Sequence, residues 1–135
     1  MIKAEGIHKT FEDFTALDNI TCNISDGCIY GMVGSNGAGK STFLRVLSGI
    51  YKPDKGCAYI DDEPIYENPK VKENIVFVSD ELFFLPGATM SKMADFYSSI
   101  YDRFNYDRFL KLAELFELNI KKPIANFSKG MKRQA

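Results

Sequence analysis

The sequence contains only one histidine, His8, and three cysteines, and this scarcity excludes several kinds of site. A metal site with three imidazole ligands cannot form from one histidine within this chain. We interpret His8 as a surface residue at the end of a strand. Cys22, Cys28 and Cys57 lack the paired CxxC spacing of zinc and redox sites, so we expect them to be buried, reduced thiols.

The sequence also lacks a long apolar run and an excess of charge of one sign. No stretch approaches the length of a membrane span, and the charged residues 1–5 do not fit a signal peptide. The formal net charge of −1 excludes the global basic field that concentrates proteins on nucleic acid or anionic lipid. We therefore expect a cytoplasmic protein that does not bind nucleic acid.

What is present is the composition of a globular domain, with 135 residues of which 45% are hydrophobic. Short apolar runs bounded by turn residues predict strands at residues 2–8, 16–24, 28–33, 57–60 and 74–79. The last run is almost wholly apolar, as a parallel strand buried on both faces would be, and we likewise expect the apolar run 28–33 to have parallel neighbours on both sides. From Met90 the period becomes helical, which predicts a helical lobe over residues 86–127.

A glycine-rich loop carries the clearest chemical signal. It fits the phosphate-loop pattern GxxxxGKS and consists of Gly34, Ser35, Asn36, Gly37, Ala38, Gly39, Lys40 and Ser41. An apolar run precedes it and a helical pattern follows, so backbone N–H groups and the helix dipole would meet at one phosphate. We expect Lys40 to contact the β- and γ-phosphates, Ser41 to coordinate Mg²⁺, and Thr42 to add a phosphate contact.

The chain resembles the ABC ATPase family over essentially its whole length. Besides the phosphate loop, residues 7–11 and 16–20 look like the opening strands of that family. The resemblance implies that ATP is the nucleotide and that Phe11 stacks on the adenine, because Phe11 falls where the family places an aromatic residue. Phe14 is the alternative platform.

Residues 126–134 resemble the signature motif of the same family. The resemblance implies that Ser128 and Gly130 reach the γ-phosphate of a nucleotide held by a second subunit. Lys129 replaces a usual glycine and Met131 a usual glutamine, so the match is incomplete. Ser128 also suits the N-cap of a helix that starts at Lys129.

Residues 75–81 align with the family strand that normally ends in a glutamine, and Asp80 stands in its place. The alignment implies that Asp80 ligates Mg²⁺ through oxygen. The catalytic carboxylate and the histidine switch of the family follow the signature motif, so we expect both beyond Ala135 and no catalytic residue before it. We accordingly expect part of a longer subunit, which binds ATP without turnover by itself.

The expected fold is α/β: a truncated P-loop NTPase core with a mainly parallel sheet, an antiparallel β layer and a helical sub-lobe. Residues 1–85 would form the nucleotide-binding core with the β layer, residues 86–127 the helical lobe, and residues 128–135 the start of the signature helix. The antiparallel layer is assigned to residues 1–25 and 57–75.

The resemblance implies an ATPase subunit that drives a membrane permease, and the incomplete signature favours an exporter. Its partners would be a second ATPase subunit, identical or different, and a permease that holds it at the cytoplasmic face of the membrane. The alternative is an ABC ATPase without a membrane partner, of the translation-factor or DNA-repair type. A GTPase is disfavoured because residues 119–122 lack an aspartate that would pair with guanine.

Overall fold

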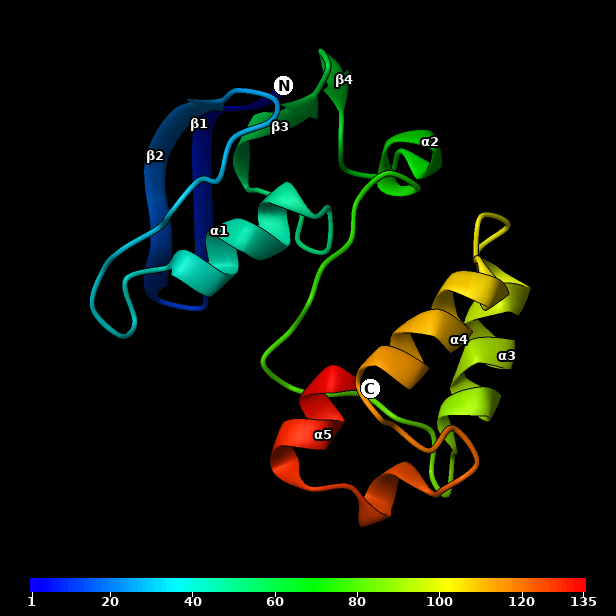
Figure 1. Cartoon of the computed structure of the whole chain (residues 1–135). Helices are drawn as coiled ribbons and strands as arrows, with labels where there is room; N and C mark the ends of the chain where they lie inside the picture. Colours follow the sequence, from blue (N-terminus) through cyan, green and yellow to red (C-terminus); the bar gives the residue numbers. More distant parts are fainter. The chain divides into compact units, whose positions relative to one another are not determined.

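The computed structural model describes residues 1–135, which form two compact units, Met1–Val78 and Ser79–Ala135 (Figure 1). The first unit contains β1 (Ile2–Phe11), β2 (Phe14–Ile24), α1 (Lys40–Leu47), β3 (Lys55–Ile60), β4 (Glu63–Pro64) and α2 (Pro69–Lys72). The second contains α3 (Met90–Ile100), α4 (Tyr106–Leu115), a 3-10 turn (Ile124–Asn126) and α5 (Lys129–Gln134). No helix is both long and apolar enough to cross a bilayer.

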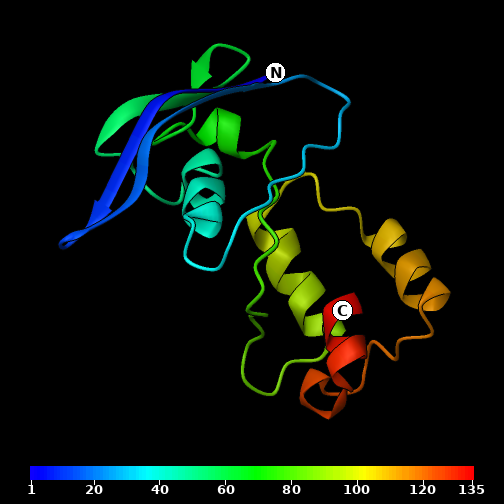
Figure 2. The same cartoon turned by 90° about the vertical axis from the view of Figure 1, so that its left-hand side faces the viewer.

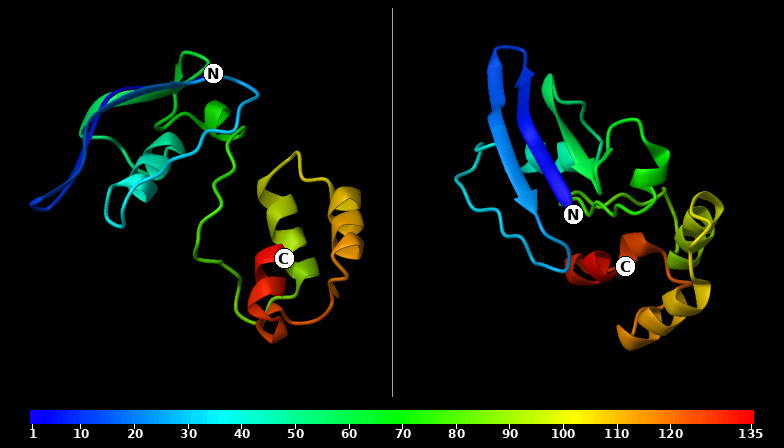
Figure 3. Two further views of the ribbon diagram at one scale, coloured as in Figure 1. Left: turned by 60° about the vertical axis from the view of Figure 1, so that its left-hand side comes forward. Right: turned by 90° about the horizontal axis from the view of Figure 1, so that it is seen from above.

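The strands of the first unit form one four-stranded sheet in the order β2-β1-β3-β4, and every pair is antiparallel. The view from above in Figure 3 shows β1 lying between β2 and β3. Ala4 of β1 lies opposite Cys22 of β2 on one side and Ala58 of β3 on the other. The antiparallel layer predicted from the sequence is therefore confirmed for residues 1–25 and 57–64, whereas residues 65–75 form no strand and include helix α2.

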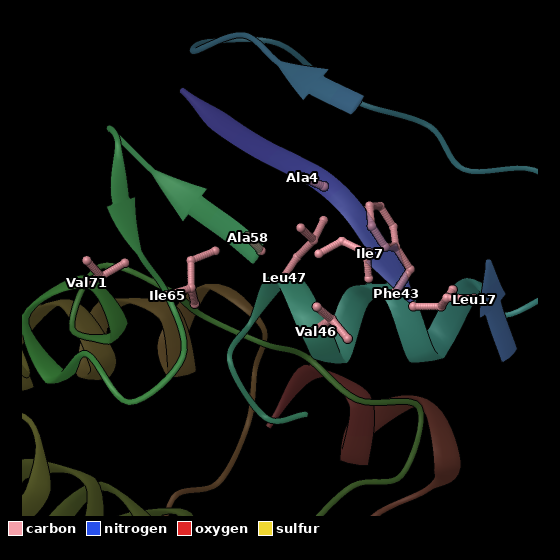
Figure 4. Packing of buried hydrophobic residues seen from close by; sticks show 9 residues of the cluster. All are labelled: Ala4, Ile7, Leu17, Phe43, Val46, Leu47, Ala58, Ile65 and Val71. Carbon is pink, nitrogen blue, oxygen red and sulfur yellow. The ribbon is translucent and has the colours of Figure 1, made fainter. Parts of the chain in front are cut away.

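Helix α1 covers one face of this sheet (Figure 4). Phe43, Val46 and Leu47 lie on one side of the helix because residues three and four apart share a face. They pack against apolar residues of the sheet and of the segment that follows it. The buried cluster consists of Ala4, Ile7, Leu17, Phe43, Val46, Leu47, Ala58, Ile65 and Val71. This packing fixes the helix that begins directly after the glycine-rich loop.

Local capping defines the helices of the second unit. The side chains of Thr89, Asn105 and Ser128 each accept a hydrogen bond from a backbone N–H in the first turn of the helix they precede. Met90 and Met93 of α3 and Ala113 of α4 are buried in a separate apolar core. The helical pattern predicted after residue 86, and the cap predicted at Ser128, are confirmed.

The two expected parallel strands do not form. Residues 28–33 and 74–79 contain no strand, and Figure 2 draws them as thin connections without arrows. Ile29 and Val33 are about 100% exposed, and Val76 and Val78 are more than 80% exposed. A strand that is apolar on both faces needs paired strands on both sides, and no strand of the sheet pairs with either segment.

Two single-residue expectations are also corrected. Cys28 is exposed rather than buried, because it lies in the unpaired segment after β2, whereas Cys22 and Cys57 are half-buried in the sheet. His8 lies inside β1 and is half-buried, with its Nδ1 atom 3.2 Å from the carboxylate of Asp18 on β2. Strand β1 extends to Phe11, three residues beyond the end at residue 8 that the sequence predicted.

We expect the 135-residue chain to self-associate through its exposed apolar segments, because their backbone N–H and C=O groups can pair with another chain. A double variant, Ile29→Lys with Val76→Lys, should lower the associated fraction several-fold in sedimentation velocity, since lysine disfavours edge pairing. Ile50→Lys is the matched control, because Ile50 is exposed but lies outside these segments. Sedimentation of the unmodified chain as a monomer would contradict this expectation.

Candidate functional site

The glycine-rich loop connects the extended residues 28–33 to α1. Gly37 and Gly39 adopt left-handed backbone conformations, with φ of 83° and 81°. Gly39 occupies the N-cap position of α1, and no side chain caps the helix there. The N–H groups of the first helical turn therefore stay available to an anion, and the helix dipole favours negative charge at the same place.

Gly39 rests directly against β2. A Cβ atom at this position would overlap the carbonyl oxygen of Ala16 and lie 3.0 Å from Leu17 Cδ2. A Cβ at Gly37, in contrast, would meet nothing within 4 Å. The second strand thus supports the end of the loop and sets where α1 begins, and only glycine allows that close approach.

The ammonium of Lys40 folds back over the loop. Its Nζ atom donates hydrogen bonds to the carbonyl oxygens of Gly34 and Ser35, each at 2.7 Å. It forms no ion pair with a carboxylate of the chain. The charge is consequently held at the loop and is not neutralised, as binding of a phosphate requires.

The next two residues lie in the first turn of α1. Ser41 is exposed and Thr42 is half-buried. No cluster of three or more carboxylate, thiol or imidazole side chains suited to a metal occurs in the chain. A hydroxyl oxygen at Ser41 is a hard ligand that suits Mg²⁺, which takes its remaining ligands from phosphate and water. The residues present therefore fit a magnesium ion that arrives with a nucleotide.

The two candidate platforms for a base lie at the turn between β1 and β2, where Phe11 is paired with Phe14. Phe11 is 39% exposed, and its ring meets the ring of Tyr51 edge to face, with 5.4 Å between centroids. Phe14 is 59% exposed and has no ring contact. Phe11 thus has an aromatic neighbour that Phe14 lacks, and Phe14 is the more exposed of the two.

A cavity of about 260 Å³ lies beside the loop, and the sequence had not indicated it. Its walls come from β2, from residues 30–33 and from the start of α1, including Gly39 and Lys40. Cys22 lines it, and burial raises the pKa of this thiol. A raised pKa keeps the thiol protonated at neutral pH, so Cys22 acts as an apolar wall and not as a nucleophile.

The remaining candidate residues belong to the second unit. Ser128 Oγ accepts a hydrogen bond from the N–H of Met131 at 3.2 Å, and Gly130 is exposed in the first turn of α5. Asp80 is exposed, in a turn where Ser79 Oγ accepts from the N–H of Glu81. Phe11 and the phosphate loop, in contrast, are parts of the first unit.

Comparison with known proteins assigns the chain to a family. The model of the ABC transporter family matches residues 17–135. The ABC transporter ATP-binding protein YtrB of Bacillus subtilis is 30% identical over 134 residues, which are 99% of this chain and 46% of YtrB. The arabinose import ATP-binding protein AraG 1 of Burkholderia ambifaria is 33% identical over 94 residues, 67% of this chain and 19% of AraG 1. The chain thus spans about half the length of YtrB and less of AraG 1.

Solved structures agree on the fold. A putative ABC transporter ATP-binding protein from Pyrococcus furiosus superposes with a TM-score of 0.80 at 27% identity, covering 98% of this chain and 66% of that one. A dimeric bacterial ABC transporter cassette superposes with a TM-score of 0.84 at 24% identity, covering 99% and 66%. These neighbours confirm the α/β class, with a phosphate loop, an antiparallel layer and a helical lobe.

Proposed function

Because this chain belongs to the ABC transporter family of ATP-binding proteins, we propose that it is the nucleotide-binding part of an ATPase that couples ATP binding and hydrolysis to transport. The observation that carries the proposal is the loop itself. An uncapped helix N-terminus and the ammonium of Lys40, which forms no ion pair, both border the same glycine-rich loop, and together they suit a polyphosphate.

The loop residues have separate tasks in this proposal. Backbone N–H groups of residues 34–39 surround the β-phosphate, and Lys40 exchanges its two carbonyl partners for oxygens of the β- and γ-phosphates. The Ser41 hydroxyl ligates Mg²⁺, which neutralises charge between these phosphates, while Thr42 adds a phosphate contact. Asp80 is a further candidate oxygen ligand for the metal.

A second ATPase subunit completes the site. Ser128 and Gly130 would contact the γ-phosphate of the ATP held by that subunit, across a dimer interface. The cap at Ser128 supports this role, because it fixes the first turn of α5 beside an exposed Gly130. One structural neighbour is likewise described as a dimer. Closure of the dimer around ATP would then drive the partner permease.

We propose a permease partner at the cytoplasmic face of the membrane and export as the direction of transport. The signature with Lys129 and Met131 resembles that of bacterial exporter subunits, although relatives named for arabinose import share part of the sequence. Affinity purification of the full-length subunit from solubilised membranes tests the partner. Recovery of a membrane permease would support the proposal, and recovery with ribosomes or nucleic acid would overturn it in favour of a non-transport ABC ATPase.

The adenine platform gives a direct test of the base site. Phe11→Ala should weaken ATP binding about 5- to 150-fold while leaving inorganic tripolyphosphate unaffected, because stacking on an aromatic ring contributes about 1–3 kcal/mol per base. Phe14→Ala is the matched control, and it should change the affinities for ATP and for tripolyphosphate by the same factor. Calorimetric titration of both ligands measures the difference. Selective loss of ATP in Phe14→Ala instead would place the base on the other ring.

A further inference from the structure

Two side chains, Tyr51 and Lys9, contact the ring of Phe11. Tyr51 meets it with an angle of 66° between the ring planes, and Lys9 Nζ lies over it at 5.5 Å from the centroid. Aromatic pairs in this geometry and cations above a ring both stabilise their contacts. Phe11 therefore has an aromatic and a cationic neighbour and is still 39% exposed, which leaves area for a ligand.

Lys9 is itself fixed by an ion pair. Its Nζ atom lies 2.7 Å from a carboxylate oxygen of Asp54, and the other oxygen of Asp54 accepts from the N–H of Thr10 at 2.7 Å. The hydrogen bond from Lys9, with that from Thr10, holds the pKa of Asp54 below its ordinary value. The carboxylate is thus charged at neutral pH, and the ammonium stays above the Phe11 ring.

Tyr51 connects this ring to the helix that carries the phosphate loop. The N–H of Tyr51 donates to the carbonyl oxygen of Arg45 in α1 at 3.1 Å, and the Arg45 guanidinium lies 5.8 Å from the Tyr51 ring centroid. The residue is therefore bound to the C-terminal end of α1, whose N-terminus forms the phosphate site. Because a helix is rigid, the contacts of Tyr51 with α1 and with Phe11 fix the position of the Phe11 ring relative to the phosphate loop.

We propose that Tyr51 is a positioning residue for the base of bound ATP, holding the Phe11 ring at a set place relative to the phosphate loop. The inference rests on the proposed function, in which Phe11 stacks on adenine. Phe14 shows the contrast, because it is opposite Phe11 in the hairpin but has neither an aromatic nor a cationic neighbour. A ring that is already ordered loses less conformational entropy when a base stacks on it.

Calorimetric titration of the full chain with Mg-ATP and with Mg-tripolyphosphate tests the inference. Tyr51→Ala should weaken ATP binding about three- to tenfold and leave tripolyphosphate binding unchanged, because only the base meets Phe11. Tyr51→Phe should retain the affinity for ATP, since it keeps the ring. Tyr66→Ala is the control, because Tyr66 contacts Lys52 and Lys72 in the same unit without touching Phe11.

The outcomes separate this inference from the proposed function. If Phe11→Ala weakens ATP selectively and Tyr51→Ala does not, Tyr51 has no positioning role although the platform is correct. Equal losses of ATP and tripolyphosphate in Tyr51→Ala would show a general effect on folding and would also overturn the role. If Phe11→Ala itself shows no selective loss, the base site is elsewhere and both proposals fail.

Discussion

Replacing Lys40 with alanine is expected to weaken ATP binding about ten- to a hundred-fold. The side chain places a cation at the loop, through hydrogen bonds to the carbonyl oxygens of Gly34 and Ser35. A charge-assisted hydrogen bond to phosphate contributes about 1.5–3 kcal/mol, and the loss of one such bond corresponds to the expected loss of affinity. Calorimetric titration with Mg-ATP measures it directly.

Two controls test whether the loss of affinity is specific to Lys40. Lys70→Ala removes an exposed positive charge from α2 in the same unit, and it should leave ATP affinity unchanged. The melting temperature of Lys40→Ala should equal that of the parent, because the ammonium bonds only to loop carbonyls. If Lys40→Ala binds ATP as tightly as the parent, the loop is not a phosphate site.

Gly39→Ala is expected to destabilise the first unit by about 2–5 kcal/mol and to abolish ATP binding. The residue has φ of 81°, a conformation that costs an alanine about 1–2 kcal/mol. Its Cβ would also overlap the carbonyl oxygen of Ala16, and forcing β2 away from the loop adds about 1–3 kcal/mol. Urea denaturation, with ATP titration in parallel, measures both effects at concentrations where the chain is monomeric.

Gly37→Ala separates these two causes. Gly37 has a similar φ of 83°, yet a Cβ there would meet no atom within 4 Å. This variant should therefore lose only about 1–2 kcal/mol, the cost of the left-handed backbone. Equal destabilisation by the two substitutions would mean that the contact between Gly39 and β2 does not support the loop.

Interpretation of the sequence succeeded where the signal was local. The pattern of residues 34–41 predicted a glycine loop followed by a helix, and α1 begins at Lys40 as expected. Ser128 was predicted to be a helix cap from its residue type, and its side chain accepts a hydrogen bond from the backbone N–H of Met131, three residues away. In both cases the interacting groups are close in the chain, so their residue types suffice to predict the geometry.

Prediction failed where pairing depends on distant residues. The apolar run 28–33 was interpreted as a buried parallel strand, and it is an exposed, unpaired segment. Composition shows that a run can form a strand, but hydrogen-bonded neighbours decide whether it does. The expected burial of Cys28 failed for the same reason, because its burial required that strand.

By itself, the sequence determined the phosphate loop, the helix that follows it, most of the antiparallel layer and the family, since these depend on short motifs and on apolar runs bounded by turn residues. Only the tertiary structure decided that the ring of Phe11 contacts another aromatic ring and that of Phe14 does not, because Tyr51 lies far from both in the sequence. The tertiary structure also explains why the loop needs glycine at position 39, where β2 approaches the backbone too closely for a side chain. Such contacts join residues that are remote in the chain, and no local pattern encodes them.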